Sequence, residues 1–111
     1  VAVDGDGDVY VVDWMNERVV IYNSEAKPLT HLRGDAADIS KWAQMTYDAN
    51  PDMMRRLRQV PNLEEQQRVF RMPVACAFDQ EANRLIVCDT QRGRLHIYHK
   101  DSNYLDPQYN L

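Results

Sequence analysis

Residues 1–24 read VAVDGDGDVYVVDWMNERVVIYNS, and a second version of this segment lies near the other end of the chain. Residues 76–100 read CAFDQEANRLIVCDTQRGRLHIYHK and align with it when one extra residue is allowed in the second loop. Such internal similarity is typical of repeat architectures. The matching positions are Asp4 and Asp79, Val9–Asp13 and Leu85–Asp89, Arg18 and Arg94, and Val19–Tyr22 and Leu95–Tyr98.

Each copy has the pattern strand, turn, strand, turn, strand. The expected strands are rich in Val, Ile, Leu and Tyr, which suit a pleated surface. Residues 4–8 read DGDGD, a strong turn signal because Gly allows a positive φ and Asp binds its own backbone. Residues 29–33 predict a fourth strand in the first copy, which makes it a four-stranded meander like a propeller blade. In the second copy a fourth strand would come from residues 104–111 or from elsewhere.

The first copy resembles the blade of the NHL-repeat family, and the resemblance covers about 65 of the 111 residues. The second copy departs from the family pattern at Arg92, where the family has Asn, and at residues 80–83, where a Gly turn is usual. The positions that carry the resemblance are Val1–Asp4, Gly7–Asp8, Val9–Asp13, Asn16, Arg18 and Val19–Tyr22.

The resemblance implies a mainly β fold: two antiparallel propeller-like blades, forming an incomplete β-propeller, with helices between them. The family includes protein-binding and RNA-binding scaffolds and some enzymes, so it implies a fold rather than a function. A propeller closes with about four to eight blades. Two blades leave apolar faces and strand edges that need cover from sister copies, from further sequence or from the chain's own helices.

The chain is predicted to divide into a first blade (1–34), a helical insert (35–73) and a second blade with a C-terminal tail (74–111), within one compact domain. Asp38 is a candidate N-cap for a first helix with apolar positions Ile39, Trp42, Ala43 and Thr46. Asn50 and Pro51 end that helix and start a second one, and residues 63–70 predict a third. The insert either covers one end of the blades or binds a partner or ligand.

Two polar pairs occupy the same place in both copies: Asp13 with Arg18, and Asp89 with Arg94. In each pair the Asp ends the second strand and the Arg begins the third, so the hairpin turn can bring carboxylate and guanidinium together. We expect both pairs to stabilise their turns rather than to act in catalysis.

Cys76 and Cys88 fall opposite each other if the second copy's first hairpin pairs in simple register, as Val1 and Val12 would in the first copy. We expect two core positions filled by small apolar side chains, with a cross-strand disulfide as the alternative. No His stands at zinc-ligand spacing from either cysteine.

The remaining motifs argue against a metal site. The DGDGD loop lacks the twelfth-position carboxylate of a calcium-binding EF-hand, since that residue is Met15. His31 is remote in sequence, and His96 and His99 point to opposite faces of a strand. We therefore expect no catalytic residue, no metal and no cofactor.

Apolar and basic side chains in the turn and the insert are candidates for contacts. Trp14, Trp42, Met53, Met54 and Leu57 form the candidate interface set. Arg55, Arg56 and Arg58 are either a solvated helix face or a contact for an anion or a nucleic acid.

Composition limits the function classes. The net charge of −4 argues against nucleic acid as a partner, and no apolar run approaches a membrane span. We expect a cytoplasmic, non-catalytic interaction or scaffold module that forms homo-oligomers or belongs to a longer propeller, and that can bind a protein or small molecule. The alternatives are a hydrolase or lyase of the six-bladed type, with a metal site between chains, and, less favoured by the acidic charge, an RNA-binding module.

Overall fold

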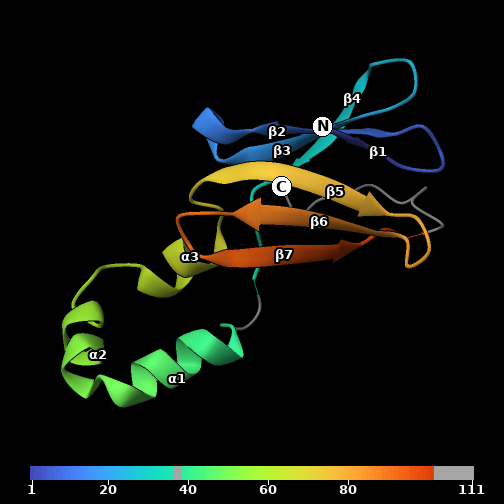
Figure 1. The fold of residues 1–111 in the computed structure, drawn as a ribbon. Helices are drawn as coiled ribbons and strands as arrows, with labels where there is room; N and C mark the ends of the chain where they lie inside the picture. The colour runs from blue at the N-terminus through green and yellow to red at the C-terminus, as the bar shows by residue number, and fades with distance from the viewer. Residues whose placement is uncertain (37–38, 102–111) are drawn as a thin grey trace. The chain divides into compact units, whose positions relative to one another are not determined.

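The computed structural model describes residues 1–36 and 39–101 of the chain. It confirms a mainly antiparallel β architecture with a few short helices. The chain divides into two compact units (Figure 1). The β unit holds residues 1–34 and the chain from Phe70 onward, and the helical unit holds residues 35–69.

The first sheet is an antiparallel meander in the order β1-β2-β3-β4. Asp13 lies opposite Arg18 at the β2–β3 turn, and the β3–β4 register shifts between Ile21 and Tyr22. The predicted fourth strand is therefore present in the first copy, as β4. The strands are β1 (Ala2–Val3), β2 (Val9–Asp13), β3 (Arg18–Tyr22) and β4 (Pro28–Leu32).

The second sheet is a three-stranded meander in the order β5-β6-β7. Asp89 lies opposite Arg94 at the β6–β7 turn, as Asp13 lies opposite Arg18 in the first sheet. The fourth strand suggested for residues 104–111 lies outside the described residues. The strands are β5 (Pro73–Asp79), β6 (Arg84–Asp89) and β7 (Arg94–His99).

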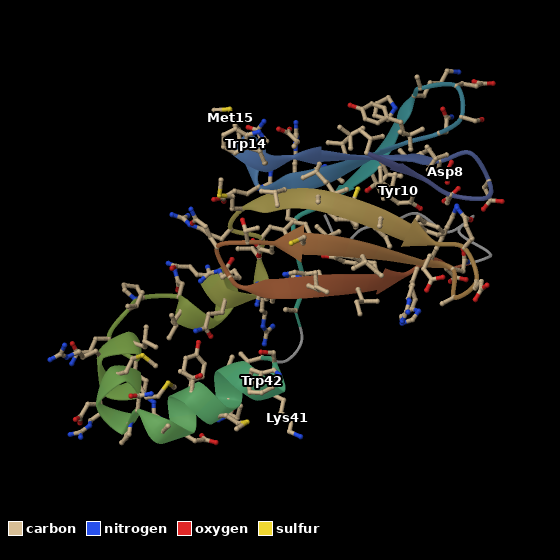
Figure 2. The ribbon with its side chains drawn as sticks, in the orientation of Figure 1. Asp8, Tyr10, Trp14, Met15, Lys41 and Trp42 are labelled. Carbon is tan, nitrogen blue, oxygen red and sulfur yellow. The ribbon has the colours of Figure 1, made fainter. Side chains whose placement is uncertain are left out.

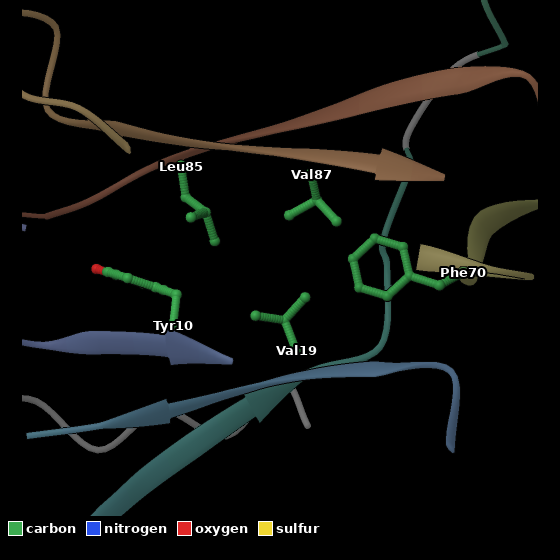
Figure 3. Packing of buried hydrophobic residues seen from close by; sticks show 5 residues of the cluster. All are labelled: Tyr10, Val19, Phe70, Leu85 and Val87. Atoms are coloured by element: carbon green, nitrogen blue, oxygen red, sulfur yellow. The ribbon is translucent and has the colours of Figure 1, made fainter. Parts of the chain in front are cut away.

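The two sheets pack face to face, and their facing side chains form the core of the β unit (Figure 3). Tyr10 and Val19 of the first sheet point toward Leu85 and Val87 of the second, and Phe70 enters from the segment before β5. Phe70, Val19 and Val87 have no exposed surface. Period-two alternation explains the pattern, because every second residue of each strand turns toward the other sheet.

The helical unit has three short helices: α1 (Lys41–Ala49), α2 (Pro51–Leu57) and α3 (Leu63–Arg68). The side chain of Ser40 accepts a hydrogen bond of 3.1 Å from the Ala43 amide and so caps α1. Pro51 begins α2 as predicted. The predicted N-cap Asp38 lies outside the described residues.

The helical unit ends earlier than the sequence boundary at residue 73. α3 stops at Arg68, and Phe70 belongs to the core of the β unit rather than to the third helix. The backbone amide of Phe70 donates a hydrogen bond of 2.8 Å to the carbonyl oxygen of Arg33. Burial of this aromatic side chain between the sheets explains why the chain leaves the helix before it. In the part of the chain that is described, every helix is too short or too polar to span a membrane.

Candidate interaction surface

The second sheet has an apolar outer face, turned away from the first sheet. Because Leu85 and Val87 point into the core, their neighbours Ile86 and Cys88 point outward. On β7 the outward residues Leu95 and Ile97 are 62% and 51% exposed. Large apolar side chains side by side on one sheet face form the kind of surface that proteins use for association. The outer face of the second sheet consists of Ala75, Ala77, Ile86, Cys88, Leu95 and Ile97.

The first sheet also has an apolar outer face. Val3 is 51% exposed there, and the other members are half-buried. β3 and β4 also enclose a shallow groove with a volume of about 430 Å³. The outer face consists of Val3, Val9, Val11, Val20 and Tyr22. The groove is lined by Arg18, Val20, Tyr22, Pro28, Leu29, Thr30 and His31.

The structure brings Asp13 and Arg18 together at the β2–β3 turn. The Arg18 Nε donates to Asp13 Oδ2 at 2.8 Å, and Asn16 Nδ2 lies 2.9 Å from both carboxylate oxygens. The Arg18 hydrogen bond, followed by that of Asn16, lowers the pKa of Asp13. Both side chains are partly exposed, so the pair stabilises a turn and contributes little beyond it.

Asp89 and Arg94 are arranged differently, because Asp89 is fully buried. Its carboxylate accepts hydrogen bonds from the backbone amides of Arg71 and Met72, at 3.1 Å and 2.8 Å to Oδ1. Arg94 Nε lies 3.8 Å from Asp89 Oδ2, which makes the two an ion pair as predicted. Asp89 therefore fixes the segment that enters β5, a role that the spacing of the two residues did not predict.

His96 lies beside Asp89 in the core of the β unit. Its Nε2 is 3.6 Å from Asp89 Oδ2, and its ring meets the ring of Phe70 edge to face at 4.7 Å. Burial lowers the pKa of His96, and the nearby charge of Arg94 adds to this, against the opposing effect of Asp89. The imidazole is therefore neutral at neutral pH.

Lys100, which the sequence did not single out, joins the two sheets. It follows β7, and its ammonium contacts the carboxylates of Asp4, Asp6 and Asp8 in the β1–β2 turn. The Nζ–Oδ2 distances are 2.9 Å to Asp6 and 3.0 Å to Asp8. Tyr10 adds a hydroxyl hydrogen bond of 2.7 Å to Asp4. The DGDGD turn is thus closed by a lysine of the other sheet.

The charges of this Lys100 cluster, defined as Lys100 with Asp4, Asp6, Asp8 and Tyr10, stabilise one another. Burial alone would raise the pKa of Asp4, but hydrogen bonds from Lys100, Tyr10 and backbone amides outweigh it and lower the pKa. Burial opposes the protonated form of Lys100, yet its carboxylate partners raise its pKa. Burial, then the bond to Asp4, raises the pKa of Tyr10. No signal in the sequence pairs Lys100 with residues more than ninety positions away.

The predicted pairing of Cys76 with Cys88 is wrong. Cys76 lies opposite Val87, and Cys88 lies opposite Ala75. The register differs by one residue from simple alignment, so the two cysteines are on opposite faces of the sheet. Both thiols are free. Cys76 packs against the core, where burial raises the pKa of its thiol.

The equivalent pairing of Val1 with Val12 is also wrong. In the first sheet Ala2 pairs with Tyr10 and Val3 with Val9, and β1 begins only at Ala2. In each copy the pairing register differs by one residue from the one that simple alignment suggested.

Trp14 and Trp42 are both strongly exposed, at 52% and 78%. Trp14 stands with Met15 at the β2–β3 turn, at the opposite end of the first sheet from Asp8, and Trp42 stands on α1 (Figure 2). The structure therefore does not bring Trp14 together with the candidate residues of the insert within one unit.

The other candidate residues lie on α2 or at its end. Met53 is exposed, whereas Met54 and Leu57 are half-buried. Arg55 forms an ion pair with Asp52, three residues before it. The three arginines Arg55, Arg56 and Arg58 are all exposed, and two of them lie in the last turn of α2, where a positive charge suits the helix dipole.

Among residues 1–36 and 39–101, no three His, Cys, Asp or Glu side chains are grouped so that they could hold a metal ion. His31 lies on β4, His96 is buried, and His99 is exposed at the end of β7.

Comparison with protein-family models gives no match to this chain, and no curated protein matches its sequence at a significant level.

Proposed function

We propose that this chain is a non-catalytic interaction module, built from two NHL-type propeller blades and completed by association with further copies of itself. The two sheets supply the blades, and their outer faces supply the association surfaces.

The observation that carries this proposal is the exposure of Leu95 and Ile97 on the outer face of the second sheet. Burial of apolar surface contributes roughly 25 cal/mol per Å², and both side chains leave much of theirs in water. Their neighbours Ile86 and Cys88 extend the same surface. Repeat units with such a face generally need a neighbouring unit to cover it.

The test is the mass of the protein in solution, measured by sedimentation velocity over a concentration series. We expect species at multiples of the 13.0 kDa chain mass, with a share that grows with concentration. A folded protein that sediments as a single chain at every concentration would contradict self-association.

A matched control distinguishes association through the outer faces from nonspecific association through any exposed apolar side chain. Met15 is 75% exposed but lies in the β2–β3 turn, outside both outer faces. Met15→Ser is expected to leave the distribution of species unchanged. A loss of association in this variant would also contradict the proposal, because the outer faces would then not be responsible.

A further inference from the structure

The side chains at the interface between the two sheets of one chain have counterparts on the outer faces of the sheets. In the alignment of the two copies, the inward residues Tyr10, Val12, Val19 and Ile21 of the first sheet correspond to positions of the second sheet that point outward. Those positions are Ile86, Cys88, Leu95 and Ile97. The outer face of the second sheet is thus the counterpart of the face with which the first sheet packs.

The converse holds for the first sheet. The inward residues Leu85, Val87, His96 and Tyr98 of the second sheet correspond to Val9, Val11, Val20 and Tyr22. All four of these corresponding side chains lie on the outer face of the first sheet, and all are half-buried. Each sheet therefore has two apolar faces. Within one chain only the inner face of each sheet is packed, and the outer face of each sheet corresponds to the inner face of the other.

The groove on the first sheet fits the same correspondence. His96 and Tyr98 of the second sheet hold the ring of Phe70, with centroid distances of 4.7 Å and 6.3 Å. Their counterparts Val20 and Tyr22 line the groove of about 430 Å³. The groove on the first sheet therefore corresponds to the part of the second sheet that holds a buried aromatic ring. It is open to an apolar side chain of another molecule.

From this we infer that the outer face of the second sheet docks head to tail onto the outer face of the first sheet of a second copy. The inference rests on the proposed function and specifies its interface. The new contact continues the interface that already joins the two sheets within one chain. The docking is heterologous, so the copies form a closed ring or a growing chain rather than a symmetric pair.

Two double variants block one face each at positions that are already exposed. Leu95→Asp with Ile97→Asp blocks the second sheet, and Val3→Asp with Leu29→Asp blocks the first. Since these side chains contribute little to the core, both proteins should fold, and circular dichroism checks this. Each variant alone is expected to sediment as a monomer.

Mixing the two variants is the decisive measurement. Each retains the face that the other lacks, so an equimolar mixture is expected to form a one-to-one dimer of twice the 13.0 kDa chain mass, and nothing larger. A mixture that stays monomeric, although wild type associates, overturns the inference. So does a single blocked variant that associates as wild type does.

The helical unit provides the matched control. Trp42→Ser with Met45→Ser removes two exposed apolar side chains of α1, and association should be unchanged. If this variant no longer associates while the sheet variants associate normally, the helices form the contact between copies. That result would overturn the head-to-tail docking but would still support self-association. A monomeric wild type would instead remove the proposed function itself.

Discussion

At the scale of single residues, the β unit depends on charged side chains whose partners lie far away in the sequence. Lys100 is 11% exposed at its side chain and Asp4 only 1%, so their contact is largely hidden from water. Buried charges of this kind are costly unless they are paired and hydrogen-bonded. Asp4 meets both conditions, since it also accepts bonds from the amides of Asp6 and Asp8.

Replacement of Lys100 by Met is expected to destabilise the β unit by about 3 kcal/mol, because it leaves three neighbouring carboxylates without their cation. Urea unfolding followed by circular dichroism measures the change. Lys27→Met is the control. Lys27 pairs with Glu25 at the solvent-exposed surface, so this substitution should lower the free energy of unfolding by less than about 1 kcal/mol. Equal effects of the two substitutions would show that the Lys100 cluster is not important for stability.

His96 makes stability depend on pH. Its pKa is lowered in the folded protein, so the unfolded chain binds the proton more tightly. The stability contribution is fully present above the unfolded value of about 6.5 and is lost as the pH falls through the folded pKa. The groups that face the imidazole are Asp89, Arg94 and the rings of Phe70 and Tyr98.

The expected outcome is a free energy of unfolding that drops as the pH falls below about 6.5, and that drops less in His96→Gln. The exposed His99 serves as the comparison, so His99→Gln should keep the wild-type slope. Urea unfolding at a series of pH values gives the slopes. A wild-type slope in His96→Gln would mean that another group titrates in this range.

At the scale of elements, each strand divides its residues between two faces, and Phe70 completes the inner one. The ring has no exposed surface and lies between the two sheets, beside Val19 and Val87 (Figure 3). It also contacts His96 edge to face. A residue that comes directly after the helices is thus a central part of the β core.

Phe70→Ala should therefore destabilise the β unit by about 3–5 kcal/mol, the usual cost of removing a buried aromatic side chain. Met15→Ala, at a side chain that is 75% exposed, should change the unfolding midpoint very little. Thermal and urea unfolding measure both. A small effect of Phe70→Ala would place this ring outside the core.

At the scale of the whole molecule, the chain leaves the β unit and returns to it at nearly the same point. The amide of Phe70 donates to the carbonyl of Arg33, and within the helical unit the amide of Ala36 donates to Arg68. The 35-residue helical unit is thus inserted between two neighbouring backbone positions. Insertions with close ends are tolerated well by the scaffold that carries them.

We expect that replacing residues 36–68 by a short Gly-Ser linker leaves the β unit folded. The measurement is a two-dimensional amide NMR spectrum, in which the resonances of β2, β3, β5 and β6 should keep their dispersion. Collapse of these resonances would show that the sheets need the helices to fold.

The local structure could be predicted from the order of the residues. The repeat located six strands and their turns, and residues 29–33 indicated the seventh strand, because apolar alternation and Gly or Asp turns are short-range signals. Pro51 likewise marked the start of α2. These features depend on residues within a few positions of one another.

Which sheet faces meet, and how the charges pair, depends on packing between distant parts of the chain. The register that separates Cys76 from Cys88 differs from simple alignment by one residue, and one residue changes the face of a strand. The contact of Lys100 with Asp4 joins residues 96 positions apart, and the burial of Phe70 depends on both sheets at once. Such contacts arise from packing in three dimensions, and no local pattern in the chain encodes them.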